Sequence, residues 1–206
     1  GEFILKNSNK KKTIGEIAFA CYLPGTFGDV KSPLPEGVEP GLIETSFFDP
    51  SNFSFPSGSH ICEVEVDEET GETKLAKYTV VDDFGTVINP LIVEGQVYGG
   101  VAQGVGQALY ENAHYDESGQ LTSASYMDYT MPRADNLLKI ALGYTCTPAT
   151  SNPLGAKGCG EAGTIAAPAA VMNAVIDAIG TDVSMPATAE KVWKTLKKNG
   201  SKKAAA

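Results

Sequence analysis

The stretch Asp82-Asp83-Phe84-Gly85-Thr86-Val87-Ile88-Asn89-Pro90 decides the fold, because it combines the end of a strand, a tight turn and the start of a helix. Asn89 suits the N-cap of that helix, and Pro90 suits its first turn. The predicted helix extends to about Tyr110. Its apolar residues recur every four positions, which is typical of a helix face that packs on a core: Val93, Val97, Val101, Val105 and Leu109.

Strands are predicted where β-branched and aromatic residues gather: 42–48, 60–66, 74–81, 121–131 and 137–146. The turn at 67–73 joins the second and third of these strands into a hairpin. Further helices are predicted from apolar periodicity at 13–22, 165–179 and 187–198. Thr13 and Glu16 form a capping box at the start of the first of them. Pro168 is tolerated in a first turn, so the helix at 165–179 is expected to begin near Ala167.

This order of elements predicts an α+β fold, in which a mixed or antiparallel sheet is packed with helices. The domain organisation expected from composition is a flexible N-terminal segment over 1–12, one domain over 13–198 and a flexible tail over 199–206. Both ends are rich in lysine, and solvated tails are favoured over a binding patch there.

Composition excludes several classes of function. The net charge of −9 disfavours nucleic acid as a partner, and no apolar run approaches the ~20 residues of a membrane span. Four cysteines without a C-x-x-C pair, together with two histidines, make a metal site of this chain alone improbable. So few cysteines in a chain of 206 residues also favour a reducing, cytoplasmic setting.

The helix predicted at 90–110 is unusually rich in glycine, and each glycine inside a helix costs roughly 0.5–1 kcal/mol relative to alanine. The glycines are Gly95, Gly99, Gly100, Gly104 and Gly106, and the amides on one face are Gln96, Gln103 and Gln107. Close approach of a polar cofactor would explain both sets. Tight helix packing beside an exposed polar stripe explains them equally well. A dinucleotide fingerprint does not, because Gly104-Val105-Gly106 lies inside a helix and lacks a third glycine.

The loop Asn152-Pro153-Leu154-Gly155-Ala156-Lys157-Gly158-Cys159-Gly160-Glu161-Ala162-Gly163 surrounds one carboxylate with glycines just before a helix. The helix N-terminus favours an ionised Glu161, and Lys157 could add to that effect. An ionised, positioned carboxylate suits a general base. From the residues alone, simple complementation of the helix dipole is favoured over that role. Cys159 is better explained as a small residue packed in a tight loop than as a ligand or nucleophile.

Several segments, in this order and spacing, resemble the C-terminal portion of the large subunit of molybdenum hydroxylases, the family of xanthine dehydrogenase, aldehyde oxidoreductase and carbon monoxide dehydrogenase. The resemblance covers about residues 13–195. It is carried by 152–163 and by shorter segments: Leu34-Pro35-Glu36-Gly37, Phe47-Phe48-Asp49-Pro50, Glu63-Val64-Glu65-Val66-Asp67, Val81-Asp82-Asp83-Phe84-Gly85, Ile88-Asn89-Pro90, Glu94-Gly95-Gln96 and Gly104-Val105-Gly106-Gln107-Ala108-Leu109.

The resemblance implies a fold that is the C-terminal half of a molybdopterin-binding large subunit, and an oxidoreductase activity. The cofactor would be molybdopterin with molybdenum, in its cytosine dinucleotide form or as plain molybdopterin. Glu161 would be the catalytic base, taking a proton from a molybdenum-bound hydroxyl whose oxygen is transferred to a small substrate such as an aldehyde or a heteroaromatic ring. The resemblance also implies cofactor contacts: Phe84, Gly85, Thr86, Asn89, Gln96, Gln103, Lys157, Gly158, Cys159 and Gly160.

The same resemblance implies partners. The family's large subunit is several times longer, and the cofactor-binding loops of its N-terminal half have no counterpart here. The cofactor would therefore be shared with the remaining part of the large subunit, with iron–sulfur clusters and FAD on other domains or subunits. We expect the isolated chain to be inactive. A non-catalytic structural or assembly module that kept the fold is the alternative hypothesis, although Glu161 and its glycines are intact.

Overall fold

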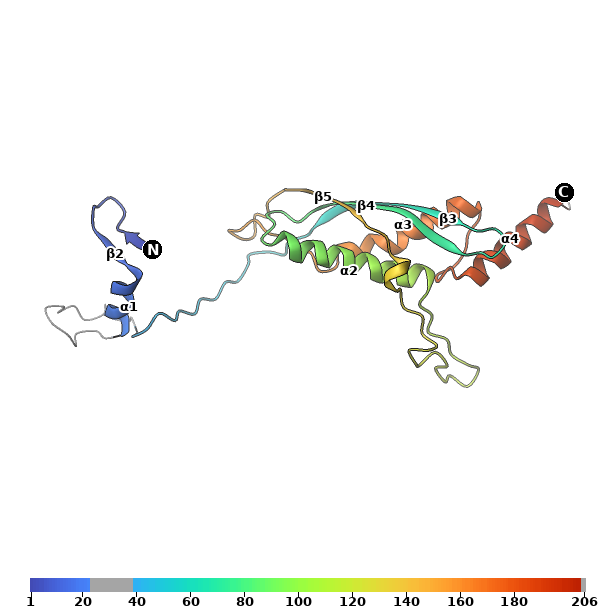
Figure 1. The fold of residues 1–206 in the computed structure, drawn as a ribbon, viewed down its shortest axis with the longest axis horizontal. Coiled ribbons are helices and arrows are strands. Elements are labelled where there is room, and N and C mark those ends of the chain that lie inside the picture. Colours follow the sequence, from blue (N-terminus) through green and yellow to red (C-terminus); the bar gives the residue numbers. More distant parts are fainter. Residues whose placement is uncertain (23–38, 205–206) are drawn as a thin grey trace. The chain divides into compact units, whose positions relative to one another are not determined.

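The computed structural model describes residues 1–22 and 39–204, and the side chains up to residue 198. The chain forms two compact units, Gly1–Asp49 and Pro50–Ala206 (Figure 1). The sequence analysis expected one domain over 13–198, whereas the structure divides the chain after Asp49. The resemblance segment Leu34–Gly37 lies outside the described residues.

The first unit contains an antiparallel pair of strands, β1 (Glu2–Ile4) and β2 (Lys11–Thr13), followed by helix α1 (Ile14–Tyr22). Residues 1–12, expected to be flexible, therefore carry two strands, which an ion pair between Glu2 and Lys11 links on the surface. No residue of α1 is buried. The unit shows no core of its own in its described part, which explains why composition gave no sign of the hairpin.

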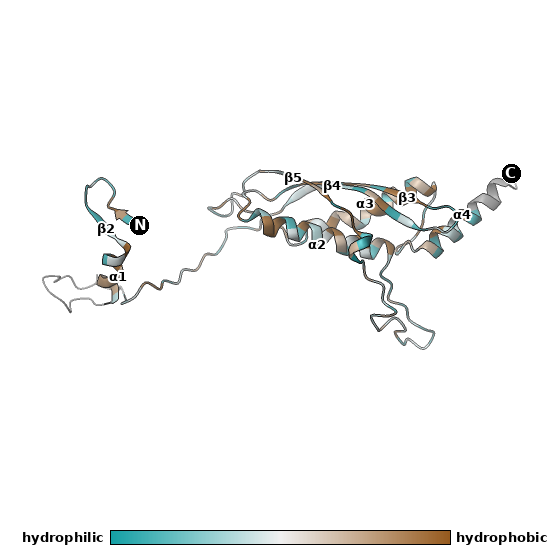
Figure 2. Cartoon of the chain, in the orientation of Figure 1, coloured by the Kyte–Doolittle hydropathy of each residue, from teal (hydrophilic) through white to brown (hydrophobic). Residues whose placement is uncertain are grey.

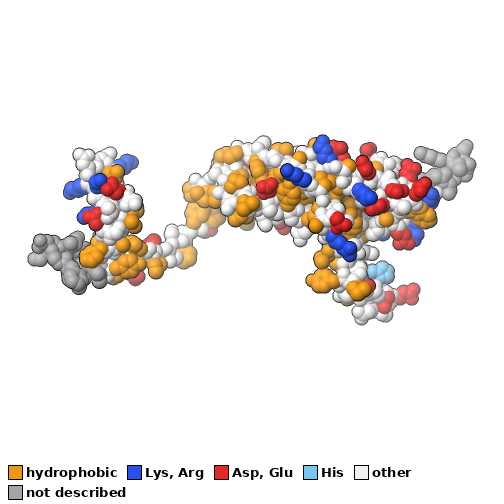
Figure 3. All heavy atoms as spheres, in the orientation of Figure 1, with side chains coloured by type: hydrophobic (Ala, Val, Ile, Leu, Met, Phe, Trp, Pro, Cys, Tyr) orange, Lys and Arg blue, Asp and Glu red, His pale blue; other side chains and the backbone are white. Residues whose placement is uncertain are grey.

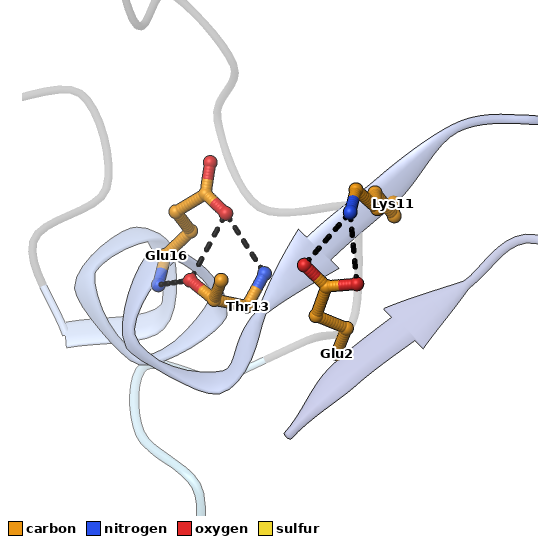
Figure 4. Close-up of polar contacts among 4 residues, drawn as sticks. All are labelled: Glu2, Lys11, Thr13 and Glu16. Atoms are coloured by element: carbon orange, nitrogen blue, oxygen red, sulfur yellow. Dashed lines mark hydrogen bonds and ion pairs between the residues drawn. The ribbon is translucent and has the colours of Figure 1, made fainter.

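The capping box at the start of α1 is confirmed (Figure 4). The backbone N–H of Thr13 donates to Glu16 Oε2 at 2.8 Å, and the backbone N–H of Glu16 donates to Thr13 Oγ1 at 3.2 Å. The Thr13 N–H first, then the Thr13 hydroxyl and the Lys12 ammonium, lower the pKa of the Glu16 carboxyl to about 2. A threonine followed three positions later by a glutamate was enough to predict this geometry.

The second unit is built on a mixed three-stranded sheet in the order β3-β4-β5. Strand β3 (Ser57–Val66) pairs antiparallel with β4 (Thr73–Asp83), and β4 pairs parallel with β5 (Ala141–Thr145). Helix α2 (Pro90–Leu109) lies in the connection between the two parallel strands. Helices α3 (Ala162–Ile179) and α4 (Ala189–Ala204) follow, and a 3-10 turn, η1 (Ala134–Asn136), precedes β5. The predicted α+β class with a mixed sheet is confirmed.

The core lies where α2 and α3 pack against each other and α3 packs against β3 (Figure 2). The predicted stripe of α2 is confirmed, because Val93, Val97, Val101, Val105 and Leu109 are all buried. They meet buried residues of β4 and α3: Tyr78, Val80, Ala167, Val171 and Val175. Full burial of each valine or leucine contributes about 1.5–3 kcal/mol, so this stripe fixes α2 on the rest of the unit.

Helix α3 begins earlier than predicted, at Ala162, so that Pro168 lies inside it. A proline there removes a backbone hydrogen bond and costs about 3 kcal/mol in a solvated helix. Packing against α2 offsets that cost, because Pro168 Cδ lies against Gly104. By length and composition α3 could also cross a membrane, but its apolar residues Val171, Met172 and Val175 are buried in the core.

Two predicted strands are wrong. Residues 42–48 are extended without a partner strand. Residues 121–131 belong to a segment that projects from the end of α2, with one isolated bridge between Tyr115 and Leu121 (Figure 1). Figure 3 shows hydrophobic side chains exposed along this segment. The side chain of Met127, for example, is 95% exposed. Local β-propensity indicated strands there, but a strand also needs a paired neighbour.

Candidate cofactor-binding site

Most of the predicted site residues gather at one edge of the sheet. Strands β4 and β5 run parallel, and their last residues, Asp83 and Thr145, pair with each other. The chain segments that follow, 84–89 and 146–161, therefore leave the sheet at the same edge. Ligands of open sheets with parallel strands bind at this carboxyl edge. Parallel pairing thus brings together two sequence segments that were singled out separately.

Backbone contacts join these two segments. Lys157 N donates to the carbonyl of Phe84 at 2.9 Å, and Thr86 N donates to that of Gly155 at 3.0 Å. Gly85 has a φ of +60°, and a Cβ there would collide with the carbonyl oxygen of Gly155. Only glycine fits this position, because it combines a left-handed conformation with close backbone approach.

The side chain of Lys157 also helps to hold these two segments together, and we call Asp83, Gly85, Gly155 and Lys157 with their mutual contacts the frame. Its Nζ lies 3.0 Å from Asp83 Oδ1, and both side chains are largely buried. The N–H of Gly85 also donates to Asp83 Oδ1, at 2.9 Å. The Gly85 N–H first, then the Lys157 ammonium and the groups of Thr147, hold the pKa of the Asp83 carboxyl far below its ordinary value. Lys157, predicted to contact the cofactor and to assist Glu161, is engaged here with Asp83.

Sequence reasoning missed Asp83 as the anchor of this frame. The signal was present, because two consecutive acidic residues end a strand just before a glycine that requires a tight turn. Alternation in a strand predicts that neighbouring side chains point to opposite faces. Both Asp82 and Asp83 are nevertheless buried, so each needs a separate partner inside the unit.

The predicted contacts in the first segment divide by exposure. The Phe84 side chain is 1% exposed and packs in the core beside Tyr144. Its aromatic ring is therefore a structural element, and any contact with a cofactor would come from the backbone. Thr86 is exposed. Asn89 is exposed as well and caps α2, with its side chain accepting from Ile92 N at 3.3 Å, which confirms the predicted N-cap.

Glu161 occupies the N-cap position of α3, yet its side chain makes no capping hydrogen bond. The carboxylate is exposed, while its backbone carbonyl accepts from the N–H groups of Thr164 and Ile165. A Cβ on Gly160 would lie 4.0 Å from Gln96 Nε2, so the loop before α3 lies beside the amide face of α2. Cys159 is partly buried and Gly158 faces open space.

The glycines of α2 form two sets. One set is packed tightly against neighbouring residues, and the other is open to the approach of a cofactor. A Cβ on Gly100 would lie 2.7 Å from Thr164 N, and one on Gly106 would lie 2.9 Å from Pro132 Cδ. Gly104 is equally crowded by α3. Gly95 and Gly99, by contrast, have nothing within 4 Å of an added Cβ. In the first set, Gly100 and Gly104 are explained by packing against α3, and Gly106 by its contact with Glu111 and Pro132. The second set leaves bare backbone open beside Gln96.

A concave surface lies along the C-terminal half of α2. A groove of about 500 Å³ is lined by Gln103, Gln107, Glu111, Ala113, Tyr129 and Thr164. Within it the Tyr129 hydroxyl donates to Glu111 Oε2 at 2.6 Å. A larger hollow of about 660 Å³ also lies near the C-terminal end of α2, between the start of β4 and the start of α4, and no predicted site residue lines it. In the described residues, no group of three or more metal-ligating side chains is found.

Comparison with known proteins shows which family carries this arrangement. Residues 1–138 match the family model for the molybdopterin cofactor-binding domain. This chain belongs to that family. The chain is 36% identical over 197 residues to the carbon monoxide dehydrogenase large chain of Hydrogenophaga pseudoflava, and the alignment covers 94% of this chain and 23% of that protein. It is 40% identical to the nicotine 6-hydroxylase large subunit of Paenarthrobacter nicotinovorans, over 94% of this chain and 24% of that subunit.

Solved structures agree. The chain superposes on carbon monoxide dehydrogenase from Oligotropha carboxidovorans with a TM-score of 0.80 and 37% identity, over 93% of this chain and 23% of that one. For quinoline 2-oxidoreductase from Pseudomonas putida 86 the TM-score is 0.74 with 39% identity, over 80% and 21%. The resemblance to molybdenum hydroxylase large subunits is therefore confirmed. The chain spans about a quarter of the length of the curated relatives it matches.

The loop that carries Glu161 lies beyond the residues matched by the family model. The alignments with the two large-subunit relatives cover 94% of the chain and so necessarily include 152–163. The loop therefore lies within the aligned part of the chain.

Proposed function

We propose that the molybdopterin-binding chain is a component of a molybdenum-dependent hydroxylase that oxidises a small substrate with oxygen derived from water, and that Glu161 is its general base. The observation that carries the proposal is the state of Glu161. Its carboxylate is exposed, makes no hydrogen bond in the described structure and follows a glycine-rich loop whose frame is fixed by Asp83 and Lys157. A base must have such a free acceptor at a defined position.

The residues present fit a large polar cofactor. Gly95 and Gly99 offer backbone that nothing in the described structure covers, and Gly158 does the same from the loop. The exposed amides of Gln96 and Gln103 can donate to and accept from pterin and phosphate groups beside that backbone. When bound, the molybdenum cofactor supplies the redox chemistry. The proposed contacts are Gly85, Thr86, Asn89, Gln96, Gln103, Gly158, Cys159 and Gly160, together with the backbone of Phe84 and Lys157.

The chain's own part in the reaction is to hold and move a proton. Glu161 stands at the start of α3 and its side chain makes no capping hydrogen bond, so that either carboxylate oxygen can accept a proton from the reacting hydroxyl. The glycines on both sides let the loop approach the reacting group closely. The rigid Gly85–Gly155 contact keeps the loop in register with the amides of α2, and so limits the positions from which the carboxylate can act.

The partners and cofactors complete the proposal. The cofactor would be the cytosine dinucleotide form of molybdopterin, shared with the remaining part of a large subunit, with iron–sulfur clusters and FAD on other domains or subunits. The names of similar proteins point to carbon monoxide, nicotine or an aldehyde as their substrates. For this chain we propose a small aldehyde, heteroaromatic or similar substrate. The four free cysteines support a reducing, cytoplasmic setting.

The test is Glu161→Gln in the assembled enzyme. The amide keeps the shape of the side chain but cannot take a proton, so kcat should fall by about 10²–10⁴-fold or more. Molybdenum and pterin content, measured on the same preparation, should be unchanged. Glu65→Gln, on the exposed face of β3, is the matched control and should turn over normally. Near-normal turnover of Glu161→Gln with full cofactor would refute the assigned role and favour a structural module.

A further inference from the structure

A row of buried polar side chains crosses the sheet beneath α3. His60 lies on β3, and its Nδ1 is 2.9 Å from the Tyr78 hydroxyl on β4. Its Nε2 is 3.5 Å from Asp82 Oδ1, also on β4. The side chains of His60 and Asp82 are only 2% and 3% exposed. Nothing in the proposed chemistry uses these groups, so their burial requires a separate explanation.

The polar atoms of His60 and Tyr78 have partners within this row, whereas one oxygen of Asp82 has none. In the tautomer with a proton on Nε2, neutral His60 accepts from the Tyr78 hydroxyl and donates toward Asp82 Oδ1. Burial lowers the pKa of His60 and raises that of Asp82, in each case against the attraction of the other. Asp82 Oδ2 is buried and has no hydrogen-bond partner in the described structure. An unsatisfied carboxylate oxygen at such a depth is costly.

A small cavity lies beside this carboxylate. Its volume is about 100 Å³, and it is lined by Pro56, Ser57, Gly58, His60, Asp82, Ala162, Ile165 and Ala166. One wall is therefore Asp82, and another is the first turn of α3. Gly58 keeps the space beside the carboxylate open, because a Cβ at that position would collide with Asp82 Oδ1.

Two N–H groups at the start of α3 lack a hydrogen-bond acceptor in the described structure. The N–H groups of Thr164 and Ile165 donate to the carbonyl of Glu161. Those of Ala162 and Gly163 have no acceptor among the described residues. Glu161 stands at the N-cap position but its side chain does not cap. The start of α3 thus has N–H groups that lack an acceptor, and the nearby cavity is bordered by Asp82 Oδ2, which lacks a donor.

We propose that this cavity is a binding site for ordered water, held by Asp82 Oδ2 and by the free N–H groups at the start of α3. Asp82 then caps the helix across one water molecule. The volume suffices for up to about three waters, each occupying about 30 Å³. A metal ion fits less well, because His60 and Asp82 are the only strong ligands on its walls and helix N–H groups repel a cation.

In this arrangement Asp82 caps α3 through water, and Glu161 is available as the proposed base. Because Asp82 satisfies the helix end, Glu161 is left without a structural hydrogen bond. That last consequence matters for catalysis only if Glu161 is the base, and so rests on the proposed function. The water site itself does not depend on it.

The first test is a high-resolution crystal structure of the assembled enzyme. We expect an ordered water within hydrogen-bond distance of Asp82 Oδ2 and of the first turn of α3. A cavity that is dry, filled by a side chain or occupied by a metal ion would overturn the proposal.

The second test is hydrogen–deuterium exchange of the amides at 163–165 in the assembled enzyme. Asp82→Asn should speed their exchange about fivefold, as loss of a helix cap does. Ala166→Val, which narrows the cavity while leaving Asp82 in place, should do the same and keeps the test open if Asp82→Asn fails to fold. Asp177→Asn, an exposed acid at the other end of α3, is the matched control and should change nothing. Unchanged exchange in both cavity variants would refute the site, whatever the activity of Glu161→Gln.

Discussion

The two halves of the glycine pattern in α2 make opposite use of the same residue. Gly100 and Gly104 bring α2 so close to α3 that their backbones touch, whereas Gly95 and Gly99 face open space. In the first case the missing side chain is a packing requirement of the fold. In the second it leaves a surface free for something outside the described residues. The difference teaches that glycine content alone indicates neither, and that the partner of each glycine decides its role.

The largest expected effect comes from closing the contact between the helices. Gly163→Ala places a methyl group against the backbone of α2, 3.0 Å from Val101 N and closer still to the carbonyl of Val97. Backbone cannot move aside as a side chain can, so the free energy of unfolding should fall by about 3 kcal/mol. Urea denaturation followed by circular dichroism measures this. An unchanged midpoint would show that α2 and α3 can separate at no cost.

A second prediction concerns the ion pair between Asp83 and Lys157, which holds together the two segments of the candidate site. Asp83→Asn removes a carboxylate whose pKa is depressed in the folded state by Gly85 N–H and Lys157. Such a group stabilises the fold above its unfolded pKa of about 3.9, and this contribution disappears as the pH falls through the lower folded pKa. The variant should therefore be clearly less stable at pH 7 and nearly equal to the parent at strongly acidic pH.

Thermal unfolding from pH 7 down to strongly acidic conditions checks the pH dependence. Lys157→Met in the parent and in the Asp83→Asn background completes a double-mutant cycle. Lys157→Met should matter much less once Asp83 is gone. A difference between parent and Asp83→Asn that stays constant with pH would contradict the assigned ion pair.

The smallest expected effect is at the open glycines. Gly95→Ala meets no atom within 4 Å, so it should stabilise the chain by about 0.5–1 kcal/mol through helix propensity alone. Gly104→Ala is its matched counterpart and should destabilise. In the assembled enzyme Gly95→Ala should lower molybdenum occupancy, if the cofactor approaches this backbone. If Gly95→Ala lowered the free energy of unfolding, Gly95 would not differ from the packed Gly104, and the comparison would fail.

Local patterns in the sequence predicted local geometry well. The four-residue spacing of valines identified the buried face of α2, and Asn89 and the Thr13–Glu16 pair identified helix starts, because caps and stripes involve neighbours within one or two turns. The start of α3 was predicted too late. Pro168 is unfavourable in isolation, and only its contact with Gly104 explains how the helix continues through it.

Long-range contacts were beyond the sequence. Lys157 was expected to face the cofactor and Glu161, but its partner is Asp83, 74 positions away. Phe84 was expected to touch the cofactor, but the pleat of β4 and the turn at Gly85 bring its ring into the core. No propensity or spacing reveals such pairs, since they depend on which strands become neighbours. The groove residues Glu111 and Tyr129 were missed for the same reason.

The parallel pairing of β4 with β5 also has a consequence for folding. The hairpin β3–β4 can form from adjacent residues, and α2 can form from its own turns. The edge of the sheet that carries the proposed site forms only after β5 has paired with β4, across the whole of α2 and the projecting segment. Contacts of such high sequence separation form slowly because loop closure must come first. We therefore expect the loop before Glu161 to be among the last parts of this unit to acquire protection during refolding.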